Sequence, residues 1–158
     1  MKSKRTMNDP AGTMPPKLSS DQEKAIVSLA SSGRKAWEAG NTRQAELDFL
    51  ASWDAIPEPK LEYDFSQSAS YGITIFYRSI GNIDAAKQWL DIVRKAYGPG
   101  IASEEYVNFL EATIRYENQE FEKAFSLFNP QYQAYGVRAF EGEDKKYLDF
   151  VRKWKQRN

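Results

Sequence analysis

A ten-residue pattern that occurs twice constrains the fold more than any other feature of this chain. In residues 40–49 and again in residues 81–90, a Gly-Asn pair is followed by an Ala five positions after the Gly and by a large apolar residue four positions later. An amphipathic stretch of about four helical turns precedes each copy. Gly-Asn favours a turn, and small residues let two helices approach closely. Each copy therefore predicts a helix–turn–helix hairpin.

Apolar periodicity and helix-ending residues divide the rest of the chain. Residues 1–17 lack this periodicity, and we expect a disordered N-terminal arm there. Residues 18–158 are predicted to form a single all-α domain of stacked antiparallel helical hairpins. The expected hairpins cover about residues 20–57, 61–98 and 103–129, and a C-terminal helical pair over residues 130–157 is expected to cap the stack.

Three local signals predict where helices start. Ser20 and Glu23 have the spacing of a capping box, in which each side chain bonds the other residue's backbone N–H. Ser103 is expected to cap the first helix of the third hairpin. Asn129 followed by Pro130 predicts a new helix with proline at its first position. Since proline breaks helix interiors, all seven prolines are expected in the arm or at helix boundaries.

The residue composition excludes several classes of function. The chain has no Cys and no His, which rules out disulfides, thiol nucleophiles, imidazole bases and cysteine-based zinc sites. Its 22 basic residues are balanced by 22 acidic ones, so bulk nucleic-acid binding is not favoured. We expect no cofactor and no metal. No apolar segment follows the basic start, and the uncharged run of residues 65–77 is too short to span a bilayer, so the cytoplasm is the expected location.

The hairpin pattern resembles the tetratricopeptide repeat family. The matching positions are Leu29, Gly33, Gly40, Ala45, Phe49, Ser52 and Pro57 in the first repeat, Tyr77, Gly81, Ala86 and Leu90 in the second, and Ala124 and Phe128 in a degenerate third. The three Ala anchors lie 41 and 38 residues apart, whereas the family's period is 34 residues. The resemblance implies a tetratricopeptide-like solenoid with lengthened loops between the hairpins.

In such a stack the first helix of each hairpin lines the concave side, which commonly binds a partner. The resemblance places there Arg34, Trp37, Glu38, Tyr71, Ile75, Arg78, Tyr116, Glu117 and Asn118. Trp, Tyr and Arg dominate interface energetics because they combine large contact area with directed hydrogen bonds. Core packing is the alternative interpretation for Trp37, and packing on neighbouring loops or the C-terminal helix is the alternative for Tyr71 and Ile75.

A shorter resemblance suggests what the partner is. The segment from Ala134 to Phe150 is similar to the C-terminal stretch of small bacterial helical-repeat proteins that act as immunity proteins against polymorphic, Rhs-type toxins. This resemblance implies a non-catalytic protein that neutralises a cognate toxin domain by binding and occluding it. The alternatives are an adaptor or co-chaperone scaffold that binds peptides and, more remotely, an enzyme on a helical scaffold that uses paired carboxylates such as Glu104 and Glu105.

Overall fold

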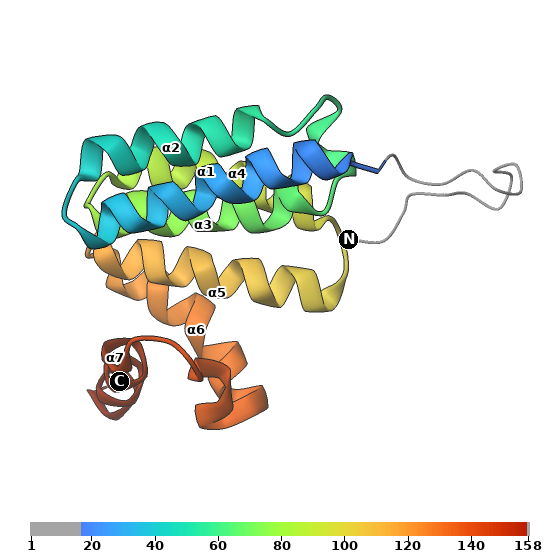
Figure 1. Ribbon diagram of the computed structural model, residues 1–158. Coiled ribbons are helices and arrows are strands. Elements are labelled where there is room, and N and C mark those ends of the chain that lie inside the picture. The colour runs from blue at the N-terminus through green and yellow to red at the C-terminus, as the bar shows by residue number, and fades with distance from the viewer. Residues whose placement is uncertain (1–16, 158) are drawn as a thin grey trace, which may run out of the picture.

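The structure, a computed structural model, describes residues 17–157, and this part of the chain is helical with no strand (Figure 1). Apart from Lys17, the predicted N-terminal arm lies outside the described residues. The helices are α1 (Ser20–Glu38), α2 (Thr42–Asp54), α3 (Phe65–Ser79), α4 (Ile83–Tyr97), α5 (Ile101–Glu117), α6 (Phe121–Tyr135) and α7 (Lys145–Arg157), with the short 3-10 helices η1 (Lys60–Glu62) and η2 (Gly136–Phe140).

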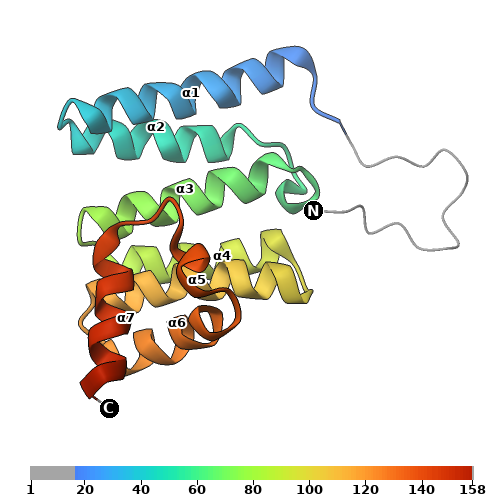
Figure 2. The ribbon, with the colours of Figure 1, turned by 90° about the horizontal axis from the view of Figure 1, so that it is seen from below.

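Consecutive helices pack in antiparallel pairs. α1 packs on α2, α3 on α4 and α5 on α6, while α4 also contacts α5 and so joins the second pair to the third (Figures 1 and 2). The final segment, η2 and α7, lies across the third pair. The predicted all-α class and the pairing of adjacent helices are confirmed.

The repeated Gly-Asn pattern adopts the same structure at both sites. Gly40 and Gly81 have φ values of +81° and +80°, a region that glycine enters without a steric cost. The next residues, Asn41 and Asn82, each accept a 3.2 Å hydrogen bond from the backbone N–H three residues later. Each pair therefore ends one helix and caps the next.

The first pair is held together by a close approach at Gly33. A Cβ atom at this position would lie 2.8 Å from the Phe49 ring of α2. That ring is itself fixed by edge contacts with Trp37 and Phe76, whose centroids lie 6.2 and 5.3 Å away. Only glycine lets α1 and α2 approach this closely.

Two apolar cores share α5. The first core contains Phe76 of α3, Leu90 of α4 and Leu110 of α5. The second core surrounds Phe128 of α6 and includes Phe109 from α5 together with residues of η2 and α7: Phe140, Tyr147 and Val151. The C-terminal segment is thus part of a packed core rather than a separate pair of helices.

Three predicted helix boundaries were wrong. The capping box at the start of α1 is formed by Ser19 and Gln22, one residue before the predicted Ser20 and Glu23. α5 begins at Ile101, so Ser103 lies inside it, where its hydroxyl donates to the Tyr97 carbonyl.

The third correction concerns Pro130, which lies inside α6 instead of starting a new helix. A proline in a helix interior costs about 3 kcal/mol because it removes a backbone hydrogen bond. Contacts on both sides of it offset this cost: Phe128 is fully buried, and the Gln131 side-chain amide donates to the Glu105 carbonyl at 2.8 Å. The third hairpin therefore covers residues 101–135 instead of 103–129, and η2 and α7 replace the helical pair predicted over residues 130–157.

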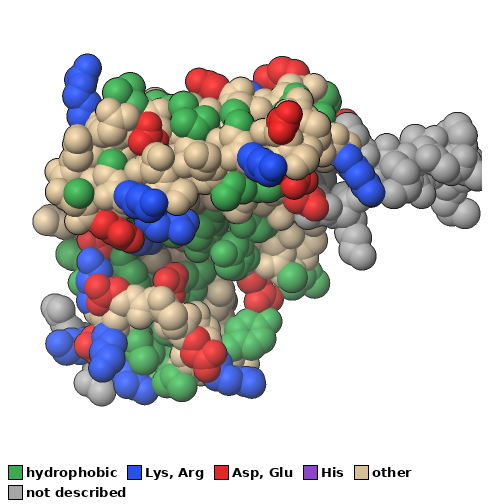
Figure 3. All heavy atoms as spheres, viewed as in Figure 1, with side chains coloured by type: hydrophobic (Ala, Val, Ile, Leu, Met, Phe, Trp, Pro, Cys, Tyr) green, Lys and Arg blue, Asp and Glu red, His purple; other side chains and the backbone are tan. Residues whose placement is uncertain are grey.

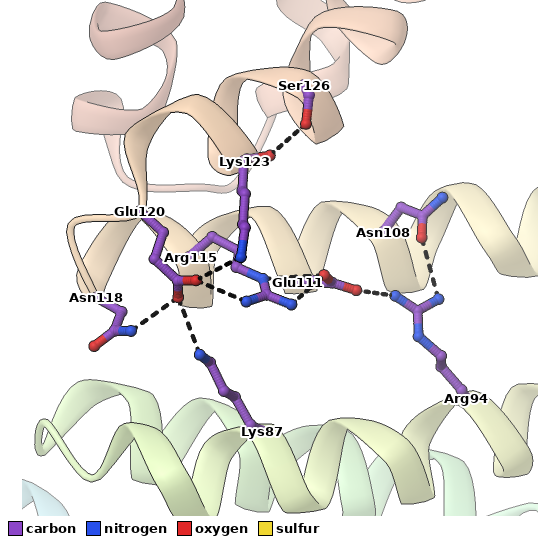
Figure 4. Close-up of polar contacts among 9 residues, drawn as sticks. All are labelled: Lys87, Arg94, Asn108, Glu111, Arg115, Asn118, Glu120, Lys123 and Ser126. Atoms are coloured by element: carbon purple, nitrogen blue, oxygen red, sulfur yellow. Dashed lines mark hydrogen bonds and ion pairs between the residues drawn. The ribbon is translucent and has the colours of Figure 1, made fainter.

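A chain of charged contacts joins α4 to the third hairpin (Figure 4). Glu111 of α5 lies between two arginines: Arg94 of α4 donates to one of its oxygens, and Arg115 donates to the other at 3.1 Å. Glu120, in the turn before α6, accepts hydrogen bonds from Arg115 at 2.8 Å and Lys87 of α4 at 3.0 Å. Asn118 adds a third donor to Glu120 at 2.8 Å.

These donors make Glu120 a source of pH-dependent stability. The hydrogen bond from Asn118, together with Lys87 and Arg115, lowers the pKa of Glu120 from 4.5 to about 2. A depressed carboxyl pKa stabilises the fold above pH 4.5, and this stabilisation is lost as the pH falls toward 2. We expect it to amount to about 1 kcal/mol, less than the full shift implies, because water screens a partly exposed side chain.

Urea unfolding at pH 6 and pH 3 tests this expectation. The difference in unfolding free energy between the two pH values should be about 1 kcal/mol smaller in Glu120→Gln than in the native chain. Glu122→Gln, which removes an exposed carboxylate two residues away, is the control. Equal pH dependence in the native chain and Glu120→Gln would contradict the assignment.

Candidate protein-binding surface

The predicted site residues of α1 divide into an exposed pair and a packed tryptophan. Arg34 and Glu38, one helical turn apart, are exposed. Trp37 is half-buried, and its ring makes edge contacts with Phe49 and Phe76 at centroid distances of 6.2 and 5.3 Å. Trp37 therefore packs on the first core, in agreement with the alternative interpretation, and leaves Arg34 and Glu38 as the accessible residues of this group.

The predicted site residues of α3 also pack within the chain. Ile75 is half-buried against the first core. Tyr71 stacks on Tyr106 of α5 with ring centroids 4.9 Å apart and lies 6.3 Å from Tyr97. Burial raises the pKa of the Tyr71 hydroxyl, and the neighbouring Tyr106 raises it further. Tyr106 is 47% exposed, so it extends the surface beside Tyr71.

Arg78 is occupied by contacts with two other elements. Its guanidinium donates to Thr113 Oγ1 of α5 at 2.9 Å and lies 6.0 Å from the centre of the Tyr147 ring of α7. The half-buried Glu143 lies in the chain between η2 and α7. It interacts electrostatically with both Arg78 and the Tyr71 hydroxyl. Burial raises the pKa of Glu143, and the charge of Arg78 opposes this rise. Part of the predicted inner face is thus covered by the chain's own C-terminal segment (Figure 2).

The last three predicted site residues lie at the end of α5, where two of them join the third hairpin to α7. The Tyr116 ring lies 5.3 Å from the Tyr147 ring and 5.1 Å from the Phe150 ring. Glu117 accepts a 2.8 Å hydrogen bond from the Tyr147 hydroxyl and forms a 2.8 Å ion pair with Lys146. Asn118 bonds Glu120 in the turn, as described above. These contacts place Tyr116 and Glu117 against α7, whereas Asn118 lies in the turn before α6.

An aromatic groove between the third hairpin and α7 was not predicted from the sequence. It has a volume of about 380 Å³. Aromatic rings from three helices line it, and charged side chains of α7 surround them. We name it the α7 groove, and its residues are Tyr116, Phe121, Phe150 and Trp154 with Lys146, Asp149 and Lys153.

One feature of the sequence could have indicated this groove. Phe150 and Trp154 are one turn apart on a helix whose other side is strongly charged, and Phe121 stands in the first turn of α6. Whether these three rings come together depends on how α7 crosses the third hairpin. No local sequence pattern specifies that crossing.

Comparison with known proteins adds no assignment, because no protein-family model, no curated protein and no solved structure matches the chain. Among residues 17–157, no group of three or more acidic side chains is close enough to hold a metal ion. None of the helices in this range is both long and apolar enough to cross a membrane.

Proposed function

We propose that this protein is a non-catalytic protein-binding module of the tetratricopeptide-like type, and that it neutralises a cognate bacterial toxin domain by covering the toxin's active site or substrate groove. The observation that supports it best is the α1 surface, where Arg34 and Glu38 are exposed one helical turn apart, next to a half-buried tryptophan that packs on the first core. Because the helix backbone is already ordered, a partner that binds this charged pair has only the two side chains to order.

The interior of the fold supports the same proposal. Two apolar cores and the ion pairs between α4 and the third hairpin hold the helices in a fixed arrangement. A surface that is already ordered needs no folding step on binding, so more of the contact energy appears as affinity. An adaptor that binds unstructured peptides is the second candidate, and an affinity for flexible peptides equal to that for a folded domain would favour it.

A matched pair of double variants tests the proposed surface. The partner is the folded domain of a toxin encoded beside this protein, and the readouts are its affinity and the survival of cells that express it. Arg34→Ala with Glu38→Ala should weaken binding by about 10-fold or more, which corresponds to about 1.4 kcal/mol. Glu23→Ala with Lys24→Ala removes the same charge types from exposed positions of the same helix and should change affinity less than about 2-fold.

Two results would contradict the proposal. If the two double variants weaken binding equally, the α1 surface near Arg34 is not the contact. If the native chain neither binds the neighbouring toxin domain nor protects cells from it, toxin neutralisation is wrong.

A further inference from the structure

The floor of the α7 groove is formed by aromatic rings, and basic side chains lie around it. Phe121 is 37% exposed, and its ring lies 5.5 Å from Tyr116 and 5.6 Å from Phe150. Trp154 closes one side, 5.5 Å from Phe150. These rings already contact one another, so a side chain entering the groove would meet a fixed aromatic surface, which favours an aromatic or leucine anchor.

The charges around the groove favour an acidic ligand. Lys146 and Lys153 line it, and Asp149 is the acidic residue among the lining side chains. The exposed side chains of Lys145 and Arg152 add positive charge on the same helix. Figure 3 shows Lys and Arg side chains gathered at the end of the molecule where α7 lies. Because the whole chain has no net charge, this basic helix is a local feature.

The two lysines differ in how strongly they are held. Lys146 pairs with Glu117 and lies 5.8 Å from the Tyr116 ring centre and 5.3 Å from that of Tyr147, so it also supports the fold. Lys153 is exposed, which makes it the better position for a test.

From these observations we infer that the α7 groove is a docking site for an acidic peptide segment of another protein that carries one aromatic or leucine anchor. This goes beyond the proposed function, because the groove lies in the C-terminal part of the fold and its ligand is a short motif. The basic charge also argues against the chain's own first residues as occupant, since Lys2, Lys4 and Arg5 would be repelled by α7.

Fluorescence anisotropy with short labelled peptides tests the inference. The probe is Asp-Glu-Asp-Phe-Asp-Glu-Asp, and two control peptides replace its Phe by Ala or its acidic residues by Lys. The native chain should bind the probe with a Kd below about 1 mM and bind each control at least about 5-fold more weakly. Phe121→Ala should weaken probe binding by about 10-fold, and Lys153→Glu by about 5-fold or more.

Lys24→Glu, an equal charge reversal at an exposed position of α1, is the matched control and should leave probe affinity within about 2-fold. Equal weakening by Lys24→Glu and Lys153→Glu, or equal binding of the probe and either control peptide, overturns the inference. So does self-association of the native chain in sedimentation that Phe121→Ala abolishes, because a second copy would then occupy the groove. The peptide test needs no native partner, so its outcome is independent of toxin neutralisation. Either proposal can fail while the other holds.

Discussion

Replacing Phe128 by alanine is expected to lower the free energy of unfolding by about 3–5 kcal/mol, the usual cost of removing a fully buried aromatic ring. The Phe128 ring has no exposed surface and stands at the centre of the second core. It contacts Phe109 of α5, Phe140 of η2 and Tyr147 of α7, at centroid distances of 5.1, 5.5 and 5.7 Å. The substitution therefore removes one ring that joins four elements.

Urea unfolding followed by circular dichroism measures this loss. Phe121→Ala is the control, because that residue is 37% exposed in the same helix, and its loss should be about 1 kcal/mol. Comparable losses for Phe121→Ala and Phe128→Ala would mean that the C-terminal segment does not pack on α6 as described.

Two glycine substitutions are expected to have opposite effects on stability. Gly33 and Gly72 both lie within helices, where alanine is normally favoured over glycine by about 1 kcal/mol. At Gly72 an added Cβ meets nothing within 4 Å, so Gly72→Ala should stabilise by about 0.5–1 kcal/mol. At Gly33 it would lie 2.8 Å from the Phe49 ring, which Trp37 and Phe76 hold in place. Gly33→Ala should therefore destabilise by about 1–3 kcal/mol in spite of the helix preference.

Thermal unfolding of the two variants under the same conditions tests these opposite effects. The melting temperature should fall for Gly33→Ala and rise for Gly72→Ala. A rise for both would show that α1 and α2 can separate enough to accept a methyl group. The claim that only glycine fits at position 33 would then be wrong.

The hairpins could be predicted from the sequence because their signals are local. Gly40 and Gly81 need the left-handed conformation, the Asn after each caps the next helix, and Ala45 and Ala86 mark the buried contact. All these requirements fall within a few residues of one another. The repeat therefore specified the first two helix pairs and their turns.

The C-terminal third could not be predicted in the same way. Local chemistry favours a helix boundary at Pro130, and α6 continues through it because residues on both sides are held by distant partners. The position of α7 depends on rings from α5 and α6 that lie far from it in sequence. Long-range packing of this kind overrides local propensity.

The candidate site shows the same division. The resemblance to tetratricopeptide repeats predicted an accessible helix surface for Arg34 and Glu38, and both side chains are exposed. Arg78 was also assigned to a partner, whereas the structure has it bonded to Thr113 and covered by Tyr147. The α7 groove was missed, because its residues come from helices whose crossing the sequence does not specify.

Hydrogen exchange of the protein, free and bound to its native protein partner, tests most directly whether it offers a pre-formed binding surface. We predict that the buried amides of α3 to α6 are equally protected in both states, and that new protection appears in the second half of α1, around Arg34 and Glu38. Gain of protection throughout α3 to α6 on binding, with no change in α1, would show that the helices order around the partner and would contradict a rigid surface on α1.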